Sequence, residues 1–158
     1  PMTRTSIMLA AALFMTVGCS SMETQTAAPK PTVSAPAAPK LSLYERLGGT
    51  GPITAVVGKF VSNVAADKRI NGYFAKADIP KLKRQLVDQV CQASGGPCTY
   101  DGKDMKTTHK GMKITGAAFN ALVEDLVAAL DTFNVPEQEK GELLSVLGPM
   151  KSDIVEVP

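Results

Sequence analysis

The sequence predicts an all-α domain, and three observations support that prediction. Apolar residues recur at helical spacing over 53–64, 79–90 and 119–133. Glycine or proline breaks separate these stretches, as at 95–97. No alternating apolar run is long enough to form a sheet. The 44% hydrophobic content, the 20% charged content and the formal net charge of +2 suit a globular domain and give no basic excess that would indicate nucleic-acid binding.

Two helices are expected in the first part of this domain. Ser42 can cap a short helix over 43–47, which Gly48-Gly49 ends. A longer helix opens at Gly51-Pro52, because proline in a first turn gives up no hydrogen bond. Its apolar residues follow helical spacing and are predicted to form the buried face: Ile53, Val56, Val57, Phe60, Val61 and Val64.

A turn at 67–71 and a short element with Tyr73-Phe74 lead to the next helix. This helix is expected over 79–92, because it is amphipathic, and it ends before Gly95-Gly96-Pro97. Its apolar stripe comprises Ile79, Leu82, Leu86 and Val90.

Two more helices are expected after residue 114. Thr115 can cap a long helix, and Asn134-Val135-Pro136 separates it from one last helix, which carries Leu143, Leu144, Leu147, Met150 and Ile154. The apolar positions of the long helix are Phe119, Leu122, Val123, Leu126, Val127, Leu130 and Phe133.

Residues 1–18 have the features of a secretion signal. Arg4 lies in a short basic region, and residues 6–17 form an apolar stretch of about 12 residues, which is too short to span a bilayer as a stable helix. The sequence Val-Gly-Cys-Ser-Ser that follows resembles a bacterial lipoprotein processing site, at which Cys19 would be lipidated. Thr16 stands where such sites usually carry leucine, so an ordinary cleaved signal with a coincidental cysteine is the alternative.

The sequence from Cys19 onward predicts a tether and one domain. Residues 19–41 are rich in Ala, Pro, Ser and Thr, which favours an extended, disordered tether. The domain is expected over 42–157, about 116 residues, which is enough for one compact core. Lipid chains on Cys19 would anchor the protein to a membrane. Ser20 favours the outer membrane of a Gram-negative-type cell envelope, with the domain in the periplasm.

His109 is the only histidine and lies in the segment YDGKDMKTTHKGMKI. A lone histidine is weak evidence, because most histidines are surface residues or core residues with satisfied hydrogen bonds. The motifs that accompany His109 along the chain are more specific. LYERLGG at 43–49, Lys59-Phe60, Tyr73-Phe74, Gly95-Gly96, a Tyr-x-Gly-x-x-Met…His pattern at 100–109 and the ending GELLSVLGPMKSDIVE occur in this order. Together they resemble the group 1 truncated haemoglobins, over nearly all of 43–156.

This resemblance implies a two-over-two helical sandwich that binds haem b non-covalently, with His109 as the proximal iron ligand. Neutral imidazole suits iron as an axial ligand. Covalent attachment is not expected, because no Cys-x-x-Cys-His occurs. Lys83, Arg84 and Tyr100 are candidates for contact with the haem propionates. The other expected haem contacts are Phe60, Val61, Phe74, Leu82, Leu86, Met105, Met112 and Phe119.

The distal side departs from the family's pattern. Val61 stands where a tyrosine is usual, and Leu82 and Leu86 stand where glutamines are frequent. None of the three can donate a hydrogen bond, and Gln85 is turned about 100° from Leu86 on the helix. A distal donor stabilises bound O₂ by roughly 1–2 kcal/mol. We therefore expect weak retention of O₂ and little discrimination against CO, and nitric oxide dioxygenation is in doubt.

Cys91 and Cys98 flank the Gly95-Gly96 break. In an oxidising envelope compartment we expect them to form a disulfide that joins the end of the 79–92 helix to the loop before His109. Free thiols and a redox-active pair are the alternatives.

These features lead to one main functional prediction and two alternatives. We expect a truncated haemoglobin of the cell envelope that binds O₂, NO or CO, with any turnover dependent on an unknown reductase or other electron donor. The first alternative is a haem-free globin-like lipoprotein that serves as an interaction module; the presence of His109, Phe60 and Phe74 argues against it. The second is a haem carrier or electron-transfer protein, which is disfavoured because no second histidine exists and neither Leu82 nor Leu86 is a methionine.

Overall fold

The computed structural model describes residues 40–157, and throughout this range the chain consists of helices joined by turns and loops. The predicted signal peptide, Cys19 and nearly all of the predicted tether lie outside the described residues. The all-α prediction is confirmed, since residues 40–157 contain no strand and a single isolated β-bridge, between Thr115 and Val157. No helix in this range is long and apolar enough to cross a membrane.

The first helix begins at its predicted cap, and the second begins one residue before the predicted Gly51-Pro52 start. Helix α1 covers Leu43–Arg46 and starts with a capping box, in which Ser42 and Glu45 each accept a hydrogen bond from the other's backbone N–H. Helix α2 covers Thr50–Ala66 and starts after Gly49, whose φ of 82° suits glycine. All six residues of its predicted apolar face are buried.

The next elements frame the segment that contains the histidine. A short 3₁₀ turn, η1, covers Asn71–Phe74, and α3 covers Ile79–Ala93. Helix α4 covers only Met105–His109, and α5 covers Gly116–Thr132. Side chains cap three of these helices, because Asp78, Asp104 and Thr115 each accept a hydrogen bond from a first-turn N–H.

The prediction of one last helix that carries both Leu143 and Ile154 is wrong. Three elements occupy this region: α6 over Glu137–Leu147, a 3₁₀ turn η2 over Gly148–Met150, and α7 over Lys151–Ile154. Pro149 has no N–H to donate and its ring clashes with the preceding turn, so the α-helix cannot continue through it.

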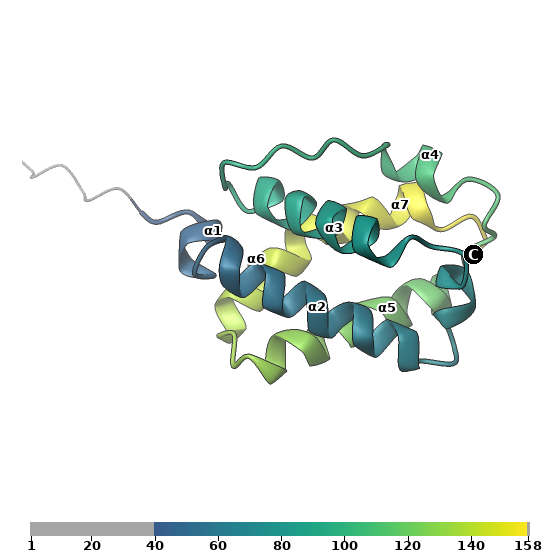
Figure 1. The fold of residues 1–158 in the computed structure, drawn as a ribbon, viewed down its shortest axis with the longest axis horizontal. Coiled ribbons are helices and arrows are strands. Elements are labelled where there is room, and N and C mark those ends of the chain that lie inside the picture. Colours follow the sequence, from purple (N-terminus) through teal and green to yellow (C-terminus); the bar gives the residue numbers. More distant parts are fainter. Residues whose placement is uncertain (1–39, 158) are drawn as a thin grey trace, which may run out of the picture. The chain divides into compact units, whose positions relative to one another are not determined.

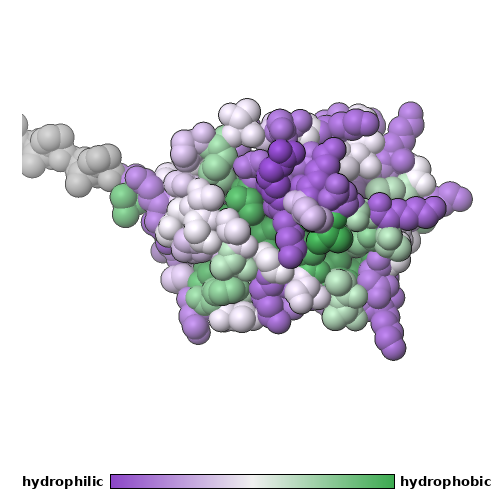
Figure 2. All heavy atoms as spheres, in the orientation of Figure 1, coloured by the Kyte–Doolittle hydropathy of each residue, from purple (hydrophilic) through white to green (hydrophobic). Residues whose placement is uncertain are grey.

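Helix α2 is central to the packing, because it packs against both α3 and α5. In Figure 1, α2 and α3 lie in front of α5 and α6, which gives the predicted arrangement of two helices over two. Helix α4 packs against α7, and α1 packs against α6. The main core lies between the layers, and its most deeply buried members include Val57, Val64, Leu130 and Leu143. Figure 2 shows that the outer face of this side is mostly hydrophilic, with apolar side chains visible near its centre.

The end of α3 is fixed to α1 and to the loop that follows it. The Tyr44 N–H donates to the Ser94 carbonyl at 2.8 Å, and Cys91 and Cys98 form a disulfide with their Cα atoms 5.7 Å apart. Gly96 fits tightly between these groups, since a Cβ there would lie 2.5 Å from the Tyr44 ring and 2.7 Å from the Cys91 Sγ. The loop that leads to His109 therefore begins at a fixed point.

Candidate functional site

A cavity of about 280 Å³ lies between α3, α4, α5 and the chain from α6 to α7. Aliphatic, aromatic and thioether side chains form most of its wall, so it is suited to a large apolar ligand. Most of the residues that the sequence predicted for a haem pocket line it. They are Phe60, Phe74, Leu82, Leu86, Tyr100, Met105, His109 and Phe119.

Helix α4 presents His109 to this cavity. Asp104 starts the helix by accepting a hydrogen bond from the Thr107 N–H at 2.8 Å. Hydrogen bonds from Thr107 lower the pKa of the Asp104 carboxyl below its usual 3.8, so Asp104 is an ionised cap at neutral pH. The helix ends at His109, because Lys110 has extended ψ and Gly111 has a φ of 81°. His109 is thus the last residue of a single short helix and lies at the cavity wall.

The His109 ring has a defined tautomer. Its Nδ1 lies 2.7 Å from the Met105 carbonyl oxygen, which can only accept, so Nδ1 bears the hydrogen and donates it. In the neutral ring the other nitrogen, Nε2, then has a lone pair, and no residue within 40–157 forms a hydrogen bond to it. A hydrogen bond from one ring nitrogen to a backbone carbonyl is the usual way in which a protein orients a histidine whose other nitrogen binds a metal.

Helix α3 forms the facing wall with both apolar and amide side chains. Leu82 and Leu86 line the cavity as predicted. Gln85 lines it as well, because the face of α3 that borders the cavity is wide enough to include the residue next to Leu86. Gln89, which was not predicted, also lines the cavity, and its position one turn after Gln85 indicates the same side of the helix. The Gln89 amide donates to the Met150 Sδ at 3.3 Å. A second, longer contact of 3.5 Å joins it to the Met105 Sδ, so the glutamine links α3 to α4 and η2.

Four residues predicted as haem contacts do not line the cavity. Val61 is buried in the main core beneath it. Met112 packs against a small second cluster formed by Ile114, Phe119 and Ile154, because the chain has already turned away from α4 at that point. Lys83 and Arg84 are exposed and lie outside the wall.

The geometry of the cavity agrees with what comparison with known proteins shows. The family model described as Bacterial-like globin matches residues 42–156. The chain belongs to the bacterial-like globin family. The predicted family resemblance is thereby confirmed, and the matched range is almost the whole of the predicted domain.

Curated relatives place this globin close to the group 1 truncated haemoglobins. The group 1 truncated haemoglobin of Tetrahymena pyriformis is 32% identical over 114 residues, which cover 72% of this chain and 94% of the relative. That of Synechocystis sp. is 37% identical over 111 residues, which cover 68% of this chain and 90% of the relative.

Solved structures show the same fold. The truncated haemoglobin of Tetrahymena pyriformis in its Fe(III) form superposes with a TM-score of 0.70 at 32% identity, covering 73% of this chain and 98% of that one. The 2/2 haemoglobin of Synechococcus sp. PCC 7002, a cyanomet form with covalently attached haem, gives 0.69 at 31% identity with the same coverage.

Tyr100 closes one side of the cavity in this globin. Its hydroxyl donates to the Lys103 carbonyl at 2.8 Å, and its N–H donates to the Gln92 side chain. Burial raises the pKa of Tyr100, and the nearby Asp101 and Asp104 act in the same direction, so the hydroxyl stays protonated at neutral pH. The hydroxyl proton is already donated within the loop and is not available to a propionate. This argues against the predicted role of Tyr100 in binding a propionate.

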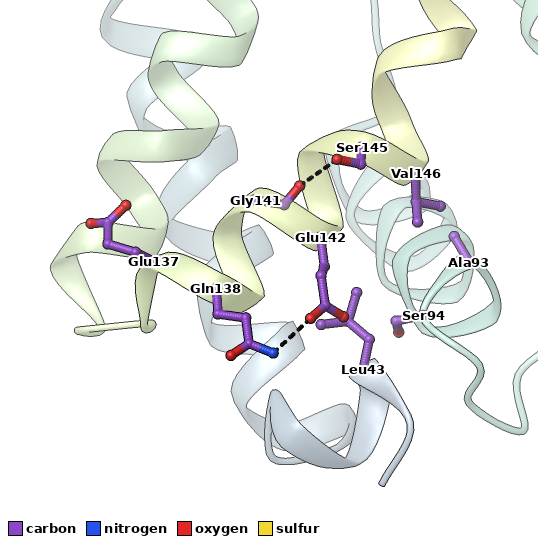
Figure 3. A pocket seen from close by; sticks show the side chains of 9 residues that line it. All are labelled: Leu43, Ala93, Ser94, Glu137, Gln138, Gly141, Glu142, Ser145 and Val146. Carbon is purple, nitrogen blue, oxygen red and sulfur yellow. Dashed lines mark hydrogen bonds between the residues drawn. The ribbon is translucent and has the colours of Figure 1, made fainter. Parts of the chain in front are cut away.

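A second hollow, of about 600 Å³, lies between α1, the end of α3 and α6, away from His109 (Figure 3). Its polar side chains already have partners. The Gln138 amide donates to Glu142, which also accepts from Arg46, and the Ser145 hydroxyl donates to the Gly141 carbonyl. Within 40–157 no group of three His, Cys, Asp or Glu residues is arranged to hold a metal ion. The cavity beside His109 is therefore the candidate site, although the second hollow is larger.

Proposed function

We propose that this globin domain binds haem b non-covalently in the cavity beside His109, with Nε2 as the iron ligand, and that it binds a diatomic gas. The observation that carries the proposal is the orientation of the imidazole. Because Nδ1–H is used by the Met105 carbonyl, the lone pair of Nε2 is left at the wall of an apolar cavity. The membership of the chain in a globin family supports the same assignment.

The residues present fit such a group. Phe60, Phe74, Leu86 and Phe119 supply apolar surface to the cavity from four different elements. Haem iron, when bound, supplies reversible binding of O₂, CO or NO. Cys91 and Cys98 are joined to each other, so neither presents a thiol to a cofactor, which supports non-covalent binding.

A titration of the full chain with haem tests this proposal. We expect uptake of one haem per chain, a Soret band, and a ferrous–CO spectrum typical of histidine ligation. Absence of stoichiometric uptake would contradict the proposal and would leave a globin scaffold that serves as an interaction module.

The α3 wall leads to a prediction about gas kinetics. Leu86 offers no donor, so O₂ is expected to dissociate rapidly from the wild-type domain. Leu86→Gln adds a donor at that position and is expected to slow O₂ dissociation about tenfold, with much less effect on CO, because O₂ accepts a hydrogen bond more strongly. Stopped-flow measurement of both off-rates checks this prediction, and Leu86→Met, of similar size but without a donor, is the matched control.

Hydrogen bonding of bound O₂ by Gln85 would contradict this prediction. Gln85 lines the cavity, and its side chain makes no hydrogen bond to another residue in the described part of the chain. Slow O₂ release from the wild type that becomes fast in Gln85→Leu would show that this amide already acts as the donor.

We infer further that the domain works in the cell envelope, attached through lipid chains on Cys19. The signal-like sequence of residues 1–18 supports this location, and so does the disulfide between Cys91 and Cys98, because disulfides persist in oxidising compartments. Gas binding to ferrous iron in such a compartment would depend on an electron donor, such as a reductase.

A further inference from the structure

The chain makes an unusual turn directly after His109. Gly111 has a φ of 81° and Lys113 has a φ of 53°, so both lie in the left-handed region. Glycine adopts this conformation without cost, but lysine adopts it rarely, and it persists only where surrounding contacts hold it. Something outside the turn must therefore stabilise the turn.

The carboxylate of Glu156 supplies that contact. Its Oε1 accepts the Gly111 N–H at 2.7 Å, and its Oε2 accepts the Lys113 N–H at 2.6 Å. The turn directs both N–H groups to one side, as in backbone sites that bind anions, and the carboxylate occupies that position. These two hydrogen bonds lower the pKa of Glu156 below its usual 4.5, and the proximity of His109 and Lys110 acts in the same direction.

The segment that contains Glu156 is itself held in place. The N–H groups of Glu156 and Val157 both donate to the Ile114 carbonyl, at 2.9 and 3.1 Å, and the Gly116 N–H donates to the Val157 carbonyl at 3.2 Å. Just before it, Ile154 at the end of α7 packs in one apolar cluster with Ile114. The carboxylate therefore acts from a fixed backbone rather than from a loose end.

The turn is coupled to the direction of the His109 ring. His109 is the last residue of α4, and its carbonyl accepts the Met112 N–H at 3.1 Å, so the turn fixes the C-terminal end of the helix. A helix of five residues has few internal hydrogen bonds with which to keep its own direction. Asp104 holds its start, and the turn after His109 holds its end.

We propose that Glu156 is a positioning residue for His109, because its carboxylate fixes the turn that sets the direction of α4 and of the imidazole at the cavity wall. This inference rests on the proposed haem ligation. It concerns a residue that does not touch the cavity and that acts only through the backbone of Gly111 and Lys113.

The test compares three variants of the full chain. Glu156→Gln keeps the size but loses the charge, Glu156→Ala loses both hydrogen bonds, and Asp153→Asn is the control. Asp153 lies on α7, is exposed, and makes no hydrogen bond or ion pair with another side chain within 40–157. In the haem-free chain, amide exchange at Gly111 and Lys113 should lose protection in the two Glu156 variants and should stay unchanged in the control.

With haem bound, two readouts report the position of the ring. The iron–histidine stretching band of the ferrous form should broaden and shift to lower frequency in the Glu156 variants. Transfer of haem to apomyoglobin should become about threefold faster in Glu156→Gln and about tenfold faster in Glu156→Ala. A second change, Lys113→Gly in the Glu156→Gln chain, should recover part of both effects, because glycine adopts the turn without help.

The outcomes separate this inference from the proposed function. No haem uptake by the unaltered chain would overturn both. Normal uptake, with Glu156 variants that match Asp153→Asn in the stretching band and in haem transfer, would overturn the positioning role alone, even if the variants were less stable. Protection at Gly111 and Lys113 that survives in Glu156→Ala would show that the carboxylate does not hold the turn.

Discussion

Replacement of His109 with alanine is expected to abolish stoichiometric haem binding. The chain has no second histidine, and His109 is the only residue of the cavity wall that presents an imidazole nitrogen. Loss of a group that merely orients a metal ligand already costs about 10–100-fold in affinity, so loss of the ligand itself should cost more than about 100-fold. Absorption spectra of the variant should show no Soret band or ferrous–CO adduct of the wild-type form.

A glycine variant makes this prediction specific to the ring. His109→Gly leaves a gap at the end of α4, and free imidazole added to the solution is expected to restore the haem spectrum in part. Lys110→Ala changes an exposed neighbour and should leave the titration unchanged. Tight, spectrally normal haem binding by His109→Ala would contradict the assignment of His109 as the iron ligand.

Loss of the Cys91–Cys98 disulfide is expected to cost about 2.5 kcal/mol of unfolding free energy. The bond closes a loop with a sequence separation of 7, and the loop-entropy relation gives about this value for so short a loop. In a domain of this size the melting temperature should fall by about 10 °C or more. Cys98→Ala is the cleaner variant, because Cys91 is fully buried and its replacement would also leave a void.

Reduction of the wild type provides the matched comparison for this variant. Dithiothreitol should lower the melting temperature of the wild type to that of Cys98→Ala and should not change the variant, which is measured under reducing conditions to prevent dimers. A wild-type chain whose melting temperature does not respond to dithiothreitol would show that the disulfide contributes no stability.

The sequence predicts most of the helices, because their signals are local. Helical spacing lies within each element and glycine or proline breaks lie close to its ends, so α2, α3 and α5 could be placed from local signals. The last helix was placed incorrectly because its apolar spacing continues across Gly148-Pro149, although the proline breaks the backbone there. In that case the backbone constraint outweighed the side-chain pattern.

The candidate site was predicted only in part, because its remaining features depend on tertiary packing. The resemblance to a family identified His109 and most of the wall. Val61 and Met112 fell outside it because packing directs them into the core and into a second cluster. Gln89 was not predicted, because the resemblance to the family indicates only Leu82 and Leu86 on this side of the helix. The contact of Glu156 with Gly111 and Lys113 spans 45 and 43 positions, and nothing in the local sequence indicates a pairing at that distance.

That long-range contact has a consequence for the order in which the protein matures. Met150 and Ile154 complete the cavity wall, and Glu156 and Val157 hold the chain after His109. The parts of the wall that α3 and α4 supply are therefore synthesised well before the residues that complete the cavity. At a synthesis rate of about 5–20 residues per second, the nascent chain spends seconds with α3 and α4 present but with nothing to close them. The cavity proposed to hold haem is therefore complete only after residues 150–157 have been synthesised.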